Sequence, residues 1–170
     1  MRFAIVLTVG LCLMSVRCGA TSSATRPAAK TDGAVVLDNV PHVEQRPDFC
    51  GEACAEMWLR KLRTNWTQDD VFNASGLDPA EGRGCYTKEL DRALRRIGFD
   101  TGEVAFAVPA GNAQALDRQF DAMRHDLARG VPSIVCMHYD DTPDATEHFR
   151  LVLGFDPKSD EVIYHEPAEA

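Results

Sequence analysis

The sequence predicts an α+β domain in which helices come first and an antiparallel sheet follows. Apolar residues that recur at spacings of three and four predict helices over residues 50–63, 67–72, 87–97 and 112–129. Short apolar or alternating runs predict strands over residues 104–108, 132–138, 149–155 and 161–165. Because the strands mostly follow the helices instead of alternating with them, we expect the sheet to pack against the first helix.

The first helix has a clear apolar face. An extended entry over residues 34–43 leads toward it, and Asp48 is a candidate cap just before Cys50. Its apolar side chains recur about one turn apart, at Cys54, Met57, Trp58 and Leu62. This pattern predicts that one side of the helix is buried against the rest of the domain.

Capping signals mark the ends of the later helices. Thr67, with the acidic Asp70 three residues later, predicts a capping box at the start of a short helix. Gly98 follows the helix that begins at Thr87, and glycine is the residue that most often ends a helix. A polar turn over residues 156–160 separates the last two strands, which predicts that they pair antiparallel.

The composition is that of one acidic globular domain. The chain has 170 residues, of which 45% are hydrophobic and 26% are charged. This length is enough for one domain with its own core. There are 18 Lys and Arg residues against 26 Asp and Glu residues, which gives a formal charge of −8. The balance argues against nucleic acid as a partner, because phosphate contacts require clustered basic residues.

The first residues are typical of an export signal. Arg2 precedes an apolar run over residues 3–16, and small residues end the segment at Ala20. The run is shorter than the roughly 20 residues that a membrane-spanning helix requires. We therefore predict cleavage after Ala20 or Ala24, and a periplasmic or secreted protein without a membrane span.

The chain is accordingly divided into three parts. We predict a signal peptide over residues 1–20, a flexible linker over residues 21–34 and one folded domain over residues 35–170. Lipidation at Cys18 is a less favoured alternative, because Arg17 is a poor neighbour for a lipidated cysteine.

The four cysteines that follow the predicted signal peptide leave three interpretations open. They are Cys50, Cys54, Cys85 and Cys136. An even number in an exported chain is typical of disulfides, and four cysteines allow three pairings. Cys50 and Cys54 are a weak pattern for zinc, because no second close pair follows. A single reactive thiol is the third interpretation, and the residues around Cys50 favour it.

The segment around Cys50 carries the strongest chemical signal. Cys50 lies in the first turn of the predicted helix, where the partial positive charge and the free N–H groups favour a thiolate. Gly51 leaves the space beside the sulfur open. Gln45 has a side-chain amide that can stand beside the Cys50 N–H and donate to a developing oxyanion. Together these residues predict a nucleophile with an oxyanion hole.

A cysteine nucleophile requires a base, and His148 is the candidate. It lies where a polar loop enters the strand that begins at Phe149, so we expect its ring to be held rigidly. Glu166 follows the next strand, and antiparallel pairing brings the end of that strand beside His148. We therefore expect Glu166 to orient the imidazole. Asp156, in the turn between the two strands, is the rival for this role.

In combination, these motifs resemble a known family. Along the chain they read Gln45-x4-Cys50-Gly-x-x-Cys54, Gly130-Val-Pro, His148-Phe, Gly154-Phe-Asp and Glu166-Pro. The set is similar to the papain-like cysteine peptidases that process double-glycine bacteriocin leaders, in the stand-alone form without a transporter. The resemblance covers residues 41–167. It implies a papain-like fold with Cys50 as nucleophile, His148 as general base and acid, Gln45 in the oxyanion hole and Glu166 orienting the histidine.

The chain departs from this family at the acid. The family usually has Asp before the proline, whereas this chain has Glu166 before Pro167. The longer arm still reaches an imidazole, but the identity of the third member is less fixed by the resemblance. The chain also stops four residues after Glu166, where family domains often continue, so a missing C-terminal piece stays open.

The predicted function is an exported cysteine peptidase that acts on a peptide or protein substrate, with no metal and no organic cofactor. Acyl transfer, as in a transpeptidase or transglutaminase, is an enzyme alternative on the same residues. A non-catalytic binding module on the same scaffold is the alternative from another class. We expect the loops over residues 78–86 and 139–147 to set specificity, while the substrate and the oligomeric state stay open.

Overall fold

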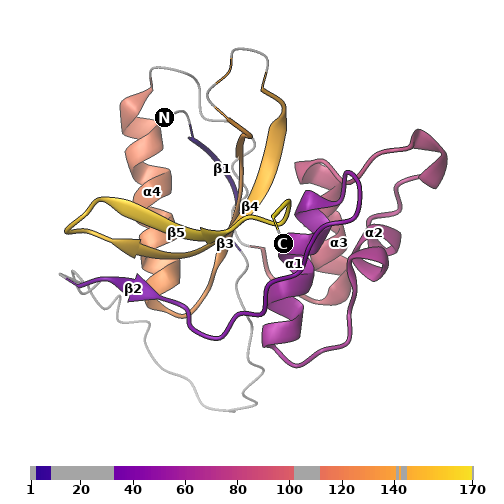
Figure 1. Cartoon of the computed structure of the whole chain (residues 1–170), viewed down its shortest axis with the longest axis horizontal. Coiled ribbons are helices and arrows are strands. Elements are labelled where there is room, and N and C mark those ends of the chain that lie inside the picture. The colour runs from indigo at the N-terminus through magenta and orange to yellow at the C-terminus, as the bar shows by residue number, and fades with distance from the viewer. Residues whose placement is uncertain (1–2, 9–32, 102–111, 141, 143–144, 170) are drawn as a thin grey trace, which may run out of the picture.

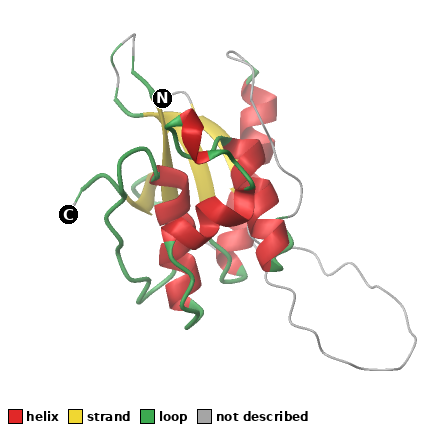
Figure 2. Ribbon diagram, turned by 90° about the vertical axis from the view of Figure 1, so that its right-hand side faces the viewer, coloured by secondary structure: helices red, strands yellow, loops and turns green. Residues whose placement is uncertain are grey.

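The fold is α+β, which confirms the sequence prediction. The computed structural model describes residues 3–8, 33–101, 112–140, 142 and 145–169. In this part of the chain the strands form one antiparallel sheet, with helices packed on both of its faces (Figure 1). When the side that carries the first three α-helices is turned toward the viewer, those helices lie in front of the strands (Figure 2).

The described residues form four α-helices, one short 3-10 helix and five strands. The helices are α1 (Cys50–Lys61), α2 (Gln68–Ser75), η1 (Pro79–Glu81), α3 (Thr87–Ile97) and α4 (Ala113–Ala128). The strands are β1 (Phe3–Thr8), β2 (Val35–Val36), β3 (Ser133–His138), β4 (Glu147–Asp156) and β5 (Glu161–His165). The strand predicted over residues 104–108 lies outside the described residues.

Strand β4 is the centre of the sheet. It pairs with β3 along one edge and with β5 along the other. Phe155 of β4 pairs with β2 on one side and with β5 on the other. Strand β2 therefore lies on the same side of β4 as β3. Leu151 lies opposite His165, so the next residue of the chain, Glu166, comes across from Arg150. The register therefore brings Glu166 close to the start of β4.

The sheet separates two hydrophobic cores. Neighbouring residues of β3 and β4 alternate between them, as expected for extended backbone. Ile134 and Leu151 belong to the core that includes α1, α2 and α3, whereas Val135 and Val152 belong to the core formed with α4. Met57 of α1 is 0% exposed within the larger core. This packing fixes α1 firmly against the sheet.

Local signals predicted most helix ends correctly. Thr67 and Asp70 form the predicted capping box at the start of α2. Gly98 ends α3 with a left-handed φ of 110°. The predicted Asp48 cap is wrong, because Phe49 is the N-cap residue of α1 and no side chain caps that helix. The first N–H groups of α1 are therefore left for other partners.

The segment predicted as a signal peptide contains β1. The structure pairs Phe3–Thr8 antiparallel with β3. Cleavage after Ala20 would remove this strand. A mature protein that has been cleaved there therefore cannot contain β1. Cleavage stays a prediction. Among the described residues, no helix combines the length and apolar character needed to pass through a bilayer.

Candidate active site

A cleft of about 630 Å³ lies where the start of α1 meets the start of β4. Its walls are formed by the residues before α1, the loop and first turn of α3, part of β3 and the start of β4. The lining residues are Gln45, Asp48, Cys50, Arg83, Gly84, Cys85, Tyr86, Thr87, Lys88, Glu89, Cys136, Thr146, Glu147, His148 and Phe149. The volume lies in the range of ligand pockets in general.

The cleft contains three of the four predicted site residues, Gln45, Cys50 and His148. The fourth, Glu166, does not line it but contacts the ring of His148. Segments far apart in the sequence therefore meet at one place. For example, the backbone N–H of Gln45, in the segment before α1, donates to the Pro167 carbonyl at 2.8 Å.

Cys50 is the first residue of α1, as the sequence predicts. Burial raises the pKa of its thiol above the ordinary 9.0, while hydrogen bonds from the Phe149, Gly51 and Cys50 N–H groups act in the opposite direction. The negative charge of Glu52 adds to the rise. The N–H groups at the helix start act in the direction that the sequence predicts, but desolvation outweighs them.

Gly51 serves packing rather than access. A Cβ atom at this position would lie 3.0 Å from Cδ2 of Leu90 and 3.1 Å from Cδ2 of Phe149. The glycine therefore lets the start of α1 approach α3 and β4 closely, and the space beside it is filled. The same approach brings Cys50 to the Phe149 N–H.

His148 is 7% exposed and is held through one ring nitrogen. Its Nε2 lies 2.5 Å from Oε1 of Glu166. A carboxylate accepts a hydrogen bond from Nε2–H, so the neutral ring carries its lone pair on Nδ1. The ring of Tyr139 packs edge-on against the imidazole, with centroids 5.1 Å apart and planes at 88°. These contacts fix both the tautomer and the orientation of His148.

The surroundings of His148 lower the pKa of its imidazole. Burial lowers the pKa of its imidazole below the ordinary 6.5, Glu166 acts to raise it, and the positive charge of Arg150 lowers it further. Burial thus disfavours both a Cys50 thiolate and a His148 imidazolium.

Glu166 bridges two buried cationic or basic groups. Its Oε1 faces His148, and its Oε2 lies 2.6 Å from Nε of Arg150. The contact with Arg150 is an ion pair whose angles do not meet hydrogen-bond geometry. The backbone N–H of Ala168 also donates to Oε1 at 3.0 Å. Asp156, the rival acid, instead accepts the N–H of Lys158 within its own turn.

Gln45 is held by the same C-terminal segment. Besides its backbone bond to Pro167, the nearby His42 places Nε2 at 2.9 Å from the Glu166 carbonyl oxygen. The amide oxygen Oε1 of Gln45 is buried and has no hydrogen-bond partner among the described residues. The segment that carries Gln45 and the segment that carries Glu166 are therefore positioned together.

A buried carboxyl group anchors the opposite wall of the cleft. Glu52 of α1 is 0% exposed, and its Oε1 accepts the backbone N–H of Cys85 at 2.7 Å. Burial raises the pKa of this carboxyl, and the Cys85 hydrogen bonds partly offset the rise. Next to it, Gly84 packs directly against the Asp48 backbone. The loop before α3 is thereby fixed to the start of α1.

Gly84→Ala is expected to destabilise the protein, because its Cβ would lie 1.9 Å from the Asp48 carbonyl oxygen. Overpacking of this kind typically costs about 1–3 kcal/mol, and here the neighbour is backbone, which cannot turn aside. Urea unfolding is the measurement. Gly33→Ala is the control, because no atom lies within 4 Å of its built Cβ. Equal loss in both variants would contradict the assigned contact.

The four cysteines among the described residues are unpaired. Cys50, Cys54, Cys85 and Cys136 are all free in the structure. Cys54 is fully buried, and burial raises the pKa of its thiol well above 9.0. Burial also raises the pKa of Cys136 to about 12. Within the residues that the structure describes, no three His, Cys, Asp or Glu side chains gather as a metal-binding group.

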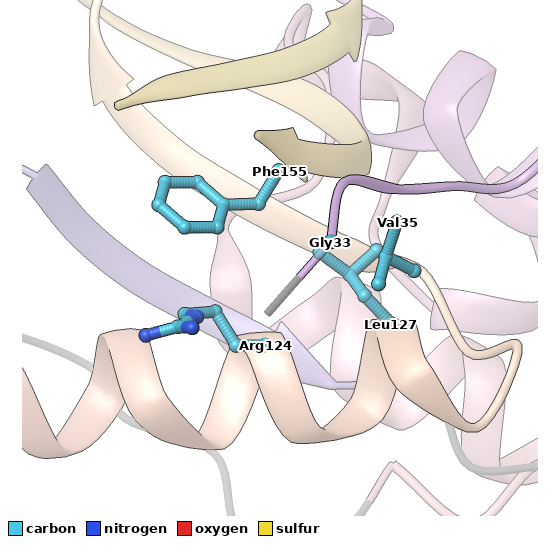
Figure 3. Close-up of a pocket in the computed structure, with 5 residues that line it drawn as sticks. All are labelled: Gly33, Val35, Arg124, Leu127 and Phe155. Carbon is cyan, nitrogen blue, oxygen red and sulfur yellow. The ribbon is translucent and has the colours of Figure 1, made fainter. Parts of the chain in front are cut away.

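A second, much smaller pocket lies on the other face of the sheet. Figure 3 shows Arg124 and Leu127 of α4 facing Phe155 of β4, with Gly33 and Val35 at the side. Its volume of about 10 Å³ is at the lower limit for one water molecule. The pocket therefore offers no room for a substrate.

Sequence reasoning missed two charged residues of the site, Arg150 and Glu52. Arg150 had a usable signal, because it is a charged residue inside an apolar strand, two positions after His148 and hence on the same side. A buried charge of this kind usually has a partner. Glu52 had none, since an acid in the first turn of a helix is common on exposed helices as well.

A comparison with family models places this geometry in context. A model described as the Peptidase_C39 like family matches residues 37–170, a region that runs from before α1 to the end of the chain. A search of curated proteins and a search of solved structures each found no match. The family match covers most of the chain and includes every residue of the cleft. The chain therefore belongs to the Peptidase_C39-like family of papain-like cysteine peptidases.

Proposed function

We propose that the protein is an exported cysteine peptidase that hydrolyses peptide or amide bonds in the cleft between α1 and β4. One observation carries the proposal. The His148 ring is held through Nε2 by Glu166, and it shares a cleft with the thiol of Cys50. This leaves Nδ1 of His148 as the basic ring atom for the reaction. The family match supports the same class of chemistry.

In the proposed first half-reaction, Cys50 attacks the carbonyl carbon of the substrate. The thiol proton passes to Nδ1 of His148 as the sulfur–carbon bond forms, and the carbonyl oxygen becomes an oxyanion. The Cys50 N–H and the Gln45 amide would donate to that oxygen, and one such donor is typically worth about 3 kcal/mol of barrier. His148 then protonates the leaving amine as the carbon–nitrogen bond breaks.

In the second half-reaction, water releases the acyl-enzyme. His148 accepts a proton from water, whose oxygen attacks the thioester carbon. The carbon–sulfur bond then breaks, the product leaves as a carboxylic acid, and the proton on His148 returns to the sulfur. Throughout the cycle, Glu166 keeps the imidazole oriented through Nε2. No metal or organic cofactor takes part in this scheme.

A broad peptide-library digest tests the proposal. The wild-type protein is expected to cleave a subset of peptides, and Cys50→Ala is expected to cleave none above background. Cys136→Ala is a matched control, because Cys136 is another thiol that lines the same cleft. Cleavage that persists in Cys50→Ala, or that is equally lost in Cys136→Ala, would refute the assignment of Cys50.

A non-catalytic binding module is the second candidate, and the burial that raises the pKa of the Cys50 thiol favours it. The two candidates differ in how Cys50 depends on His148. A catalytic thiol loses substrate turnover when His148 is replaced, whereas a binding module shows no turnover in any variant. Acyl transfer on the same residues would appear as peptides joined to an added amine.

The pH profile of kcat/KM is expected to keep its plateau down to below pH 6.5. The general base must be neutral, and burial lowers the pKa of His148 below 6.5, so activity is present above that lowered pKa and is lost as pH falls through it. Because burial raises the pKa of Cys50 above 9.0, iodoacetamide should alkylate free Cys50 slowly near neutrality and faster toward alkaline pH. A rapid alkylation plateau between about pH 5 and about pH 8 would instead indicate a thiolate–imidazolium pair.

Export is part of the same proposal. Cleavage after Ala20 or Ala24 would leave a protein that begins at Thr21 or Thr25. The mass of the intact protein recovered from outside the cytoplasm is expected to match one of these two forms. Recovery of an unprocessed chain that still carries β1 would contradict the export signal.

A further inference from the structure

Arg150 is a buried cation beside the pair formed by Glu166 and His148. It lies on β4 and is 6% exposed. Its guanidinium group sits near two aromatic rings, 5.6 Å from the centroid of Tyr139 and 5.5 Å from that of Tyr164. The side chain does not line the cleft. A buried charge is stable only when it is paired or hydrogen-bonded, so the partners of Arg150 indicate its role.

The first partner is Glu166. Nε of Arg150 lies 2.6 Å from Oε2 of Glu166, while the other oxygen of that carboxylate faces His148. The glutamate side chain is long and has several rotamers to lose when it is held in one position. The planar guanidinium restricts that side chain to the position where it meets the imidazole.

The remaining partners are two backbone carbonyls at the end of β3. The guanidinium donates to the His138 oxygen at 3.2 Å and to the Tyr139 oxygen at 2.9 Å. Tyr139 in turn packs edge-on against His148. One side chain therefore connects the acid behind the histidine with the aromatic ring beside it.

We propose that Arg150 is a positioning residue of the active site, which locks Glu166 and the Tyr139 backbone around His148 and balances the charge of Glu166. The proposal rests on the peptidase function proposed above and extends it to a residue that touches no substrate. Glu166 alone would orient the imidazole but would also stabilise its protonated form. With Arg150 paired to it, the acid orients the ring while the ring stays available as a base.

The charged and titratable groups around His148 come from four elements. They are Glu166 after β5, Arg150 on β4, Tyr139 after β3 and Cys50 at the start of α1. Of these, Glu166 favours the imidazolium and Arg150 disfavours it. Removing Arg150 therefore has one expected direction, which is protonation of His148 at higher pH.

The experiment compares Arg150→Met and Arg150→Lys with wild type and with Arg96→Met. Arg96 is a matched control, because it also donates to a backbone carbonyl, that of Ala74, and it lies outside the cleft. The ring nitrogens of His148 are titrated by NMR in protein labelled at histidine. In parallel, kcat and KM are measured on the peptide that the wild type cleaves fastest.

Arg150→Met is expected to titrate His148 at higher pH than wild type, to move the acid limb of kcat upward and to lower kcat about a hundredfold with little change in KM. Arg150→Lys keeps the charge but not the planar fork, so its titration should stay near wild type while kcat falls less. Arg96→Met should match wild type in every measurement.

An unchanged His148 titration in folded Arg150→Met would overturn the proposal. If Arg150→Met does not fold, Arg150→Lys decides: a lower kcat at unchanged KM supports the positioning role, and a wild-type kcat overturns it. The NMR titration requires no turnover. A wild type that cleaves no peptide would therefore refute the peptidase function without deciding the role of Arg150.

Discussion

Replacing His148 with alanine is expected to lower peptide turnover by about three orders of magnitude, with little change in KM. A positioned general base typically contributes about 10²- to 10⁴-fold to the rate. The upper part of that range is expected here, because burial raises the pKa of Cys50 above 9.0 and leaves little thiolate without a base. Turnover on the peptide that the wild type cleaves fastest is the measurement.

Two controls separate a lost base from a lost fold. In His148→Ala, alkylation of Cys50 at alkaline pH should continue, because a thiolate formed by hydroxide needs no imidazole. His125→Ala removes a half-exposed imidazole from α4, which packs on the other face of the sheet, and it should turn over substrate like wild type. A His148→Ala variant that keeps more than about a tenth of the wild-type kcat would remove His148 from the role of base.

The main elements of the fold could be predicted from the sequence because each carries a local physical signal. The capping box of Thr67 and Asp70 and the left-handed Gly98 fix helix ends by backbone hydrogen bonding alone. The alternation of Ile134 and Val135 between two cores is likewise a property of extended backbone. Such signals involve residues close in sequence, so they can be recognised before any tertiary contact is known.

The state of the site could not be predicted in the same way. A helix start favours a thiolate, and this local effect led to the expectation of a reactive anion at Cys50. Desolvation depends instead on how the tertiary structure packs around the sulfur, and the nearby charge of Glu52 adds to the rise in pKa. The sum of these contributions has the opposite sign, and only the tertiary structure supplies the larger one.

The acid of the site shows the same limit. Antiparallel pairing of β4 and β5 was enough to predict Glu166 beside His148, although an irregularity between Val152 and Gly154, which the sequence did not reveal, shifts the register by one residue. The role of Arg150 depends on three contacts made at once with Glu166 and with two carbonyls of another strand. A single charged residue in an apolar strand indicates that it has a buried partner, but the sequence does not identify that partner.

Glu166→Gln is expected to destabilise the protein by about 3–5 kcal/mol, because it leaves the guanidinium of Arg150 buried without a counter-charge. Both side chains of the pair are about nine-tenths buried, so solvent cannot replace the lost partner. Urea unfolding measures the loss. Glu161→Gln is the matched control, since that exposed acid on β5 forms no ion pair among the described residues and should leave stability unchanged.

The double variant Arg150→Met with Glu166→Gln separates the two roles of the acid. Removing both charges eliminates the unpaired cation, so most of the lost stability should return, as expected for two side chains in contact. Turnover should not return, because the glutamine amide offers no carboxylate to hold the protonated Nε2 of His148 through the reaction. If the double variant stays as unstable as Glu166→Gln, the lost stability comes from packing contacts of the two side chains and not from the unpaired charge. Turnover that recovers would show that Glu166 does not orient the base.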